Sequence, residues 1–259
     1  MTAMLKSTSE GSTMVLTLSN PGQRNALGPE IYAAGIEALN AADSNPEIRS
    51  VIITGEGSTF CAGGDLQRLQ NLRHEAPETQ GQGLDGLHNW IDSIRTFPKP
   101  VIAAVEGAAA GAGFSLALAA DFIVAANSAF FLMAYSNVGL SPDGGGSLAL
   151  ARALPRPLVA RALMLGERLS AAQLQTWGLV HEVTPEGHAM TAALQLAQQL
   201  NERAPNVLAS IKELINEAPD ASLVQQLDSE RDHFVRNLRH RNSAEGIDAF
   251  FQKRPPRFT

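Results

Sequence analysis

The first half of the chain alternates short apolar runs with longer segments whose apolar residues recur at helical spacing. The runs SVIIT (residues 50–54) and PVIAAV (residues 100–105) are continuously apolar, which is typical of strands buried on both faces of a parallel sheet. Strands are expected over residues 13–18, 50–54, 100–105 and 122–126, and helices over residues 29–42, 84–97 and 111–120. Strands that alternate with helices predict the α/β class.

Beyond about residue 145 the pattern becomes almost entirely helical. Ser170-x-x-Gln173 and Ser222-x-x-Gln225 have the spacing of capping boxes, which begin helices. Helices are expected over residues 146–153, 156–165, 171–177, 186–203, 205–217, 221–238 and 243–251, with one late strand over residues 180–183. We therefore expect two parts, a core over residues 1–200 and a helical C-terminal region over residues 201–259.

Three glycine-rich segments punctuate the strand-rich half of the chain. They are FCAGGDL (residues 60–66), EGAAAGAGF (residues 106–114) and GLSPDGGGS (residues 139–147). Glycine lets a ligand approach the backbone and leaves N–H groups free to donate. Tight turns or close helix packing would explain any one segment, but three together favour a ligand site. No segment matches a P-loop, and GEGSTF (residues 55–60) lacks the last glycine of a dinucleotide-binding fingerprint.

The composition of the chain disfavours or excludes several classes of protein. The formal net charge of −6 disfavours nucleic-acid binding through phosphate neutralisation. A single cysteine excludes a disulfide framework, and the six histidines lack metal-ligand spacing, so we expect no metal site. The longest uncharged run, residues 107–120, is too short for a bilayer, and no signal peptide begins the chain. We expect a cytoplasmic protein without a nucleic-acid or membrane partner.

The C-terminal end differs in charge from the rest. Residues 231–259 carry seven basic and three acidic side chains, whereas the whole chain is acidic. One interpretation is a solvated helix followed by a basic tail. The other is a surface that contacts a phosphate-bearing ligand or an acidic neighbouring subunit.

The glycine-rich segments and their surroundings resemble the crotonase superfamily, also called the enoyl-CoA hydratase/isomerase family. The resemblance rests on residues 24–27 (RNAL), 60–66, 99–121 and 139–146, followed by residues 169–171, 178–180 and the tail 250–258 (FFQKRPPRF). It implies a spiral of ββα units with a helical C-terminal trimerisation region, in homotrimers or in hexamers built as dimers of trimers. It also implies an acyl-CoA thioester as ligand, with coenzyme A as part of the substrate and no tightly bound cofactor.

The resemblance also implies an oxyanion hole made of two backbone N–H groups, those of Gly64 and Ala112. The family usually has glycine at the second position, but a backbone donor tolerates alanine. Two preorganised donors would stabilise the enolate formed when a proton is removed next to the thioester. The side chains or backbones expected to contact the substrate or CoA are those of Arg24, Ala26, Ala62, Gly63, Asp65, Leu66, Ser115, Tyr135 and Lys253.

The family's hydratases use two glutamates, and the matching positions here hold Ser115 and Tyr135. Both are poor general bases at neutral pH, which disfavours hydration of a 2-enoyl-CoA. Asp143 lies in the loop where several of the family's isomerases carry their catalytic acid. We therefore expect double-bond isomerisation with Asp143 as the proton shuttle. Candidate apolar neighbours that would raise its pKa are Phe114, Phe130, Leu132, Met133, Tyr135 and Leu140.

Several alternatives remain open from the sequence. Asp143 could be a turn residue that caps the following helix, because Pro-Asp-Gly is also good turn chemistry. The protein could be an atypical enoyl-CoA hydratase, a non-catalytic acyl-CoA-binding member, or a serine hydrolase that uses Ser115. Plain structural roles are expected for Asp65 as a helix cap, Asp121 in a helix-to-strand turn, and Cys61 as a small packed residue.

Overall fold

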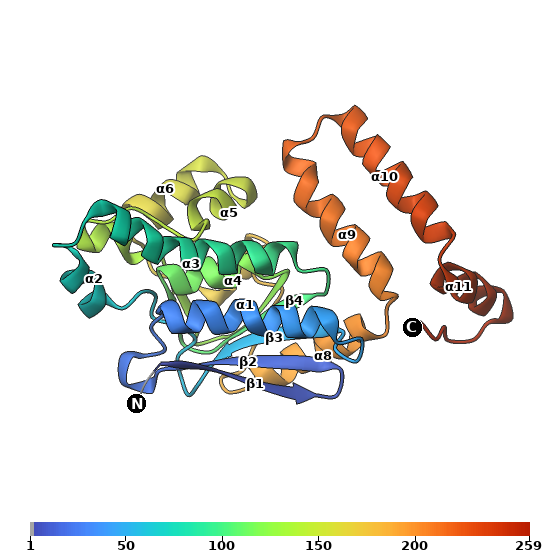
Figure 1. Cartoon of the computed structure of the whole chain (residues 1–259), viewed down its shortest axis with the longest axis horizontal. Coiled ribbons are helices and arrows are strands. Elements are labelled where there is room, and N and C mark those ends of the chain that lie inside the picture. Colours follow the sequence, from blue (N-terminus) through green and yellow to red (C-terminus); the bar gives the residue numbers. More distant parts are fainter. Residues whose placement is uncertain (1–2) are drawn as a thin grey trace.

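The computed structural model describes residues 3–259 and contains two sheets covered by helices (Figure 1). The larger sheet has the strand order β1-β2-β3-β4-β6-β9, and only β1 and β2 are antiparallel. Its strands are β1 Met4–Glu10, β2 Thr13–Ser19, β3 Ser50–Gly55, β4 Val101–Val105, β6 Phe122–Ala126 and β9 Glu182–Thr184. The smaller sheet has the order β5-β7-β8, from β5 Ala108–Ala110, β7 Phe130–Leu132 and β8 Leu169–Ser170.

The helices divide between the two faces of the larger sheet. Their bounds are α1 Pro29–Ser44, α2 Leu66–Leu72, α3 Pro77–Thr96, α4 Ala112–Ala119, α5 Gly146–Ala153, α6 Arg156–Met164, α7 Ala171–Thr176, α8 Ala189–Asn201, α9 Pro205–Glu217, α10 Leu223–Leu238 and α11 Arg241–Gln252. Short 3₁₀ turns occupy η1 Pro21–Gln23, η2 Ala134–Val138 and η3 Ala218–Asp220. Helices α1, α3 and α4 cover one face of the sheet, and α8 covers the other (Figure 1).

The continuous apolar strands follow from this double covering. In β3, Val51 and Ile53 belong to the core under α1 and α3, whereas Ile52 belongs to the core under α8. Successive residues of a strand point to opposite faces, so a strand covered on both faces needs apolar residues throughout. The predicted α/β class and the crotonase fold are confirmed. The units β4-β5-α4 and β6-β7-α5 repeat a ββα order.

Some predicted boundaries were wrong for local reasons. Helix α3 begins at Pro77 rather than residue 84, because a proline at the first helical position starts a segment whose three glycines weaken the helical pattern. Helix α8 begins at Ala189 rather than residue 186, because Gly187 has a φ of 78° and ends the preceding turn. Strand β1 was missed, since its exposed residues are largely polar.

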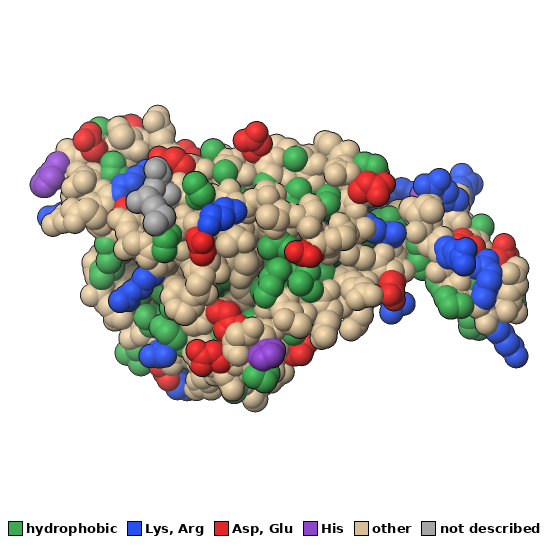
Figure 2. Space-filling view, turned by 90° about the horizontal axis from the view of Figure 1, so that it is seen from below, with side chains coloured by type: hydrophobic (Ala, Val, Ile, Leu, Met, Phe, Trp, Pro, Cys, Tyr) green, Lys and Arg blue, Asp and Glu red, His purple; other side chains and the backbone are tan. Residues whose placement is uncertain are grey.

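Helices α10 and α11 stand away from the sheets and extend the molecule (Figure 1). We call α9, α10, α11 and the tail, residues 205–259, the C-terminal arm, and residues 3–204 the body. Figure 2 shows lysine and arginine side chains gathered at the end that the arm forms. Within residues 3–259, no helix is both long and apolar enough to cross a membrane.

Candidate functional site

Two unused backbone amides, those of Gly64 and Ala112, lie on adjacent segments. Cys61 pairs with Ala109 in a parallel bridge, and this pairing holds the segment around Gly63 beside Gly111 and Ala112. A methyl group on Gly63 would lie 3.4 Å from the Ala112 nitrogen. Within residues 3–259, neither the Gly64 nor the Ala112 N–H donates a hydrogen bond to the protein.

Glycines make this close approach possible. Gly63 has a φ of 96°, and a Cβ there would meet the Ala110 carbonyl oxygen at 2.7 Å. A Cβ on Gly113 would lie 2.6 Å from the Cys61 carbonyl oxygen. Helix α4 therefore packs directly on the Cys61 segment, with its first residue Ala112 beside Gly63. The positive end of the helix adds to the attraction for negative charge at this point.

Asp143 lies in the loop before α5, and its side chain does not cap that helix. Helix α5 has Gly145 at its N-cap and no side-chain cap. The Asp143 carboxylate instead accepts a hydrogen bond from the Tyr135 hydroxyl at 2.5 Å, and its backbone carbonyl accepts one from Ser115 Oγ at 2.9 Å. The turn-residue interpretation therefore does not explain the side chain of Asp143.

Tyr135 connects Asp143 to the two amides. A methyl group on Gly111 would lie 3.8 Å from the Tyr135 hydroxyl oxygen, and Gly111 directly precedes Ala112. Gly111 is held against the end of β7, because its N–H donates to the Leu132 carbonyl at 2.8 Å. The pair of Tyr135 and Asp143 thus lies near Gly111, the residue that precedes the N-terminus of α4.

Three titratable side chains near this point, those of Tyr135, Tyr32 and Cys61, are neutral at physiological pH. Burial, followed by the charge of Asp143 and the hydrogen bond to it, raises the pKa of Tyr135 well above its usual value. Burial and then the charge of Asp143 raise the pKa of Tyr32, on α1, to about 12. Burial raises the pKa of Cys61 to about 12, so this thiol is a packed residue and not a nucleophile.

Ser115 is fully enclosed in α4 and donates its hydroxyl proton to a backbone carbonyl. No histidine hydrogen-bonds to it within the described residues. A serine nucleophile needs an adjacent general base, so the arrangement does not support the hydrolase alternative.

The residues matched to CoA contacts form a neighbouring surface. Arg24 is exposed in a left-handed conformation, and its carbonyl oxygen accepts the Ala62 N–H at 3.0 Å. The side chain of Asn25 fixes this turn, because its Nδ2 donates to the Thr59 carbonyl at 2.7 Å. A groove lies next to this turn. It is lined by Ala3, Asn20, Gln23, Ala26, Leu27, Gly28, Pro29, Glu30, Asp65 and Arg68.

Arg68 and Tyr32 also lie at this site, although no sequence pattern indicated them. Arg68 lines the groove, and its charge also lowers the pKa of Tyr32 in part, so the two side chains lie near each other. Their helices α2 and α1 carry no distinctive motif. Only the tertiary packing brings Tyr32 near Asp143 and Arg68 near Tyr32.

Two acidic residues have the structural roles expected of them. Asp65 caps α2, accepting the N–H groups of Gln67 and Arg68, and Leu66 follows as the exposed first residue of that helix. Asp121 accepts the Val101 N–H at 2.8 Å beside the turn between α4 and β6.

Of the expected apolar neighbours of Asp143, only Tyr135 bonds to it. Phe114 is fully buried against Phe131, with ring centroids 5.0 Å apart. Phe130 lies under the Arg168 guanidinium, 3.5 Å from its ring centroid.

Lys253 ends α11 in a left-handed conformation, at the opposite end of the molecule from α2 (Figure 1). It does not reach the site of its own chain. A contact with CoA through a neighbouring subunit therefore stays a prediction.

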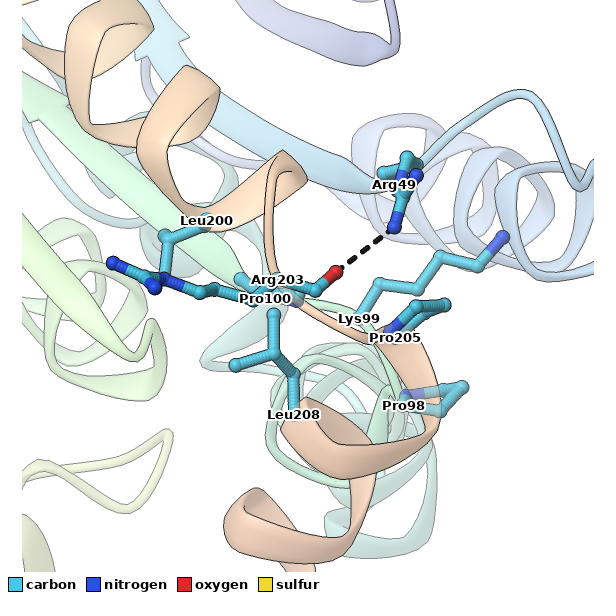
Figure 3. A pocket seen from close by; sticks show the side chains of 8 residues that line it. All are labelled: Arg49, Pro98, Lys99, Pro100, Leu200, Arg203, Pro205 and Leu208. Atoms are coloured by element: carbon cyan, nitrogen blue, oxygen red, sulfur yellow. Dashed lines mark hydrogen bonds between the residues drawn. The ribbon is translucent and has the colours of Figure 1, made fainter. Parts of the chain in front are cut away.

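A second, smaller cavity lies at the junction of the body and the arm (Figure 3). Its lining contains no acid, histidine or nucleophile: Arg49, Pro98, Lys99, Pro100, Leu200, Arg203, Pro205 and Leu208. Arg49 donates to the Arg203 carbonyl at 2.8 Å, shown as a dashed line, so this cation is used to fasten the backbone. Across residues 3–259, no group of three or more His, Cys, Asp or Glu side chains could hold a metal ion.

A sequence model of the enoyl-CoA hydratase/isomerase family matches residues 8–259. The chain belongs to this family. Members of the crotonase superfamily, to which the family corresponds, act on CoA thioesters without a tightly bound cofactor.

Three relatives show how the family varies. The chain is 39% identical to 1,2-epoxyphenylacetyl-CoA isomerase of Escherichia coli (strain K12), over 96% of each chain. It is 38% identical to carnitinyl-CoA dehydratase of Salmonella enteritidis, over 99% of this chain and 98% of the relative. A crystal structure described as an enoyl-CoA hydratase from Polaromonas sp. JS666 is 70% identical, covers 99% of this chain and 100% of its own, and has a TM-score of 0.98.

Proposed function

We propose that this family member shifts a carbon–carbon double bond in an acyl-CoA thioester, with Asp143 as the proton shuttle. The observation that carries the proposal is the hydrogen bond between Tyr135 and Asp143, because the Tyr135 hydroxyl that holds the carboxylate lies near Gly111, the residue before Ala112. One carboxylate suffices for this chemistry, because it removes a proton at one carbon and returns it at another.

The proposed reaction starts from a 3-enoyl-CoA. Asp143 takes a proton from C2, and the electron pair of that C–H bond forms a dienolate whose oxygen is bound by the N–H groups of Gly64 and Ala112. The carboxyl group then returns the proton to C4, and the double bond comes to lie between C2 and C3. The two donors stabilise the negative charge where it develops and need no reorganisation.

The arrangement of the CoA contacts is part of the same proposal. Ala26, Asp65 and Arg68 line the groove, and Arg24 and Ala62 are joined by a backbone hydrogen bond in the neighbouring turn, so this groove would hold the CoA part of the substrate. We also propose that the chain assembles as a trimer or hexamer through the C-terminal arm. The exposed apolar residues of the arm support this assembly, and the division into a core over residues 1–200 and a helical C-terminal region over residues 201–259 belongs to the same proposal.

A hydratase is the second candidate, because the 70% identical structure is described as an enoyl-CoA hydratase. Ser115 and Tyr135 weigh against it, since neither is a carboxylate that activates water. Hydration would need Asp143 alone to deprotonate water and to protonate C2.

The test compares a 3-enoyl-CoA with a 2-enoyl-CoA of equal chain length, using the wild type beside Asp143→Asn. We expect the wild type to move the 3-double bond and Asp143→Asn to lose about 10²–10⁴-fold in rate, the usual contribution of a general acid–base. Hydration of the 2-enoyl substrate by both proteins would overturn the assignment. Binding of both thioesters without turnover by the wild type would indicate a non-catalytic member.

A further inference from the structure

Tyr135 occupies an unusual place for a tyrosine. It belongs to the 3₁₀ turn Ala134–Val138, its side chain is 8% exposed, and its hydroxyl reaches the Asp143 carboxylate rather than water. The bond joins Tyr135 Oη to Asp143 Oδ1. Within the described residues, Asp143 Oδ2 accepts no hydrogen bond.

The direction of the hydrogen bond is fixed by the environment of the phenol. Burial, the charge of Asp143 and the hydrogen bond to it keep Tyr135 protonated, and a nearby hydroxyl, that of Ser115, opposes this only in part. Tyr135 therefore acts as a donor at every pH at which the protein works. A hydrogen-bond donor stabilises the charged form of a carboxylate and restricts the orientation of the carboxylate.

A second phenol near the same carboxylate provides a natural comparison. Tyr32, on α1, is buried and feels the charge of Asp143, but it makes no hydrogen bond to that side chain within residues 3–259. The other charged or titratable groups that act on Tyr32 are Arg68 and Cys61. The surroundings of Asp143 thus contain two tyrosines, of which one is bonded to it.

We propose that Tyr135 is a positioning residue that fixes the orientation of the Asp143 carboxylate, with Oδ1 bonded and Oδ2 left to exchange the proton with substrate. The kinetic consequences of this inference rest on the proposed function. The effect of Tyr135 on the titration of Asp143 can be measured in the free protein, whatever reaction it catalyses. Tyr135 thus has a role of its own at the position where the family's hydratases carry a glutamate.

The first measurement is the titration of Asp143 itself. Difference infrared spectroscopy of the carboxyl band, with Asp143→Asn as the blank, gives the midpoint in the wild type, in Tyr135→Phe and in Tyr32→Phe. We expect Tyr135→Phe to move the midpoint to higher pH, because the carboxylate loses a donor to its charged form. Tyr32→Phe should move it clearly less, since the phenol that it removes is not bonded to Asp143.

The second measurement is kinetic, on the double-bond shift. Tyr135→Phe should lower kcat about tenfold, part of the 10²–10⁴-fold that general acid–base catalysis supplies. KM should stay within about threefold, and the acid limb of kcat/KM should move to higher pH with the infrared midpoint. A purely structural role would not move this limb.

The outcomes separate the two proposals. Equal midpoints in the wild type and Tyr135→Phe, or equal shifts in the two tyrosine variants, would overturn the role of Tyr135. A shifted midpoint in an enzyme that moves no double bond would overturn the proposed function but support the coupling of Tyr135 to Asp143. If Tyr135→Phe does not fold, 3-fluorotyrosine at position 135 keeps the shape and strengthens the donor, so the midpoint should fall.

Discussion

The body and the C-terminal arm distribute their side chains in opposite ways. In the body, large apolar residues such as Trp90 and Phe114 are completely buried. In the arm, the buried residues are the polar Ser210, His233 and Asn242 and the small Ala249, while Phe250 is 79% exposed. The large apolar residues exposed on the arm are Ile211, Ile215, Leu223, Val224, Leu227, Phe234, Val235, Leu238, Ile247, Phe250 and Phe251.

The polar interior of the arm is a connected set of hydrogen bonds. Asn206 on α9 accepts from Asn242 on α11 at 2.7 Å and donates to Asn237 on α10 at 2.8 Å. Ser210 accepts from Asn237 at 2.9 Å. These bonds set the angles between the helices but supply little hydrophobic stabilisation, so the arm depends on what covers its outer face.

A partly buried ion pair fastens the arm to the body. Lys212 on α9 donates to Asp121 at 2.8 Å and also to the Ile94 carbonyl at 3.0 Å. Burial raises the pKa of Asp121 and lowers the pKa of Lys212, and the attraction between the two opposes both shifts. The body therefore contains the candidate site and its own hydrophobic core, whereas the arm exposes an apolar surface.

The largest expected effect lies in the body and removes one of the two free amides. Ala112→Pro deletes the N–H at the first position of α4, where the backbone of a helix suits proline. We expect kcat for the double-bond shift to fall about 10²–10³-fold, the usual loss for one oxyanion donor. Steady-state kinetics with a 3-enoyl-CoA measures the change.

The matched control for this variant lies in the arm. Arg241→Pro makes the same change at the first position of α11, after His240 with a ψ of 146°, which suits a residue before proline. Turnover by Arg241→Pro should equal that of the wild type. Equal losses in both variants would mean that proline at a helix start disturbs the protein in general, and the donor role of Ala112 would fail.

The next effect concerns the outer face of the arm. We expect the wild type to sediment as three or six chains, and the double variant Phe250→Glu/Phe251→Glu to fall apart into smaller species. Charges on this face prevent burial of the apolar area that would drive assembly. Analytical ultracentrifugation measures the mass, and Gln198→Glu/Gln199→Glu on the exposed surface of α8 is the control. A wild type that sediments as a single chain would refute assembly through the arm.

Much of the fold could be predicted from local pattern. The buried strands β3, β4 and β6 read as continuous apolar runs, because both faces of the sheet are covered. Strands β5 and β7 have three residues each, too few to establish a period. Their existence depends on the pairing of distant segments, which local spacing does not indicate.

The candidate site was predictable to the extent that it is made of backbone. Gly64 and Ala112 lie in segments whose glycines mark them. The hydrogen bond to Asp143 was not predictable, because Tyr135 was expected as a substrate contact and as an apolar neighbour of Asp143 but not as its hydrogen-bond donor, and Tyr32 was not singled out. The hydrogen bond from Tyr135 and the burial of both tyrosines come from the tertiary packing of distant segments.

The smallest expected effect compares one capping box in each region. Ser170 starts α7 in the body and Ser222 starts α10 in the arm, and their Oγ atoms accept the N–H of Gln173 at 3.2 Å and of Gln225 at 3.3 Å. Each Ser→Ala change should cost about 1 kcal/mol, which is about fivefold faster amide hydrogen exchange in the first turn of its own helix. Ser→Thr at the same positions keeps the acceptor oxygen and should restore most of the protection.

In the background of Phe250→Glu/Phe251→Glu, overall protection should fall in α10 but not in α7, because only α10 loses a covered face. Equal protection of both helices in that background would show that the arm is stable without a partner, and the contrast between the two regions would be one of shape alone.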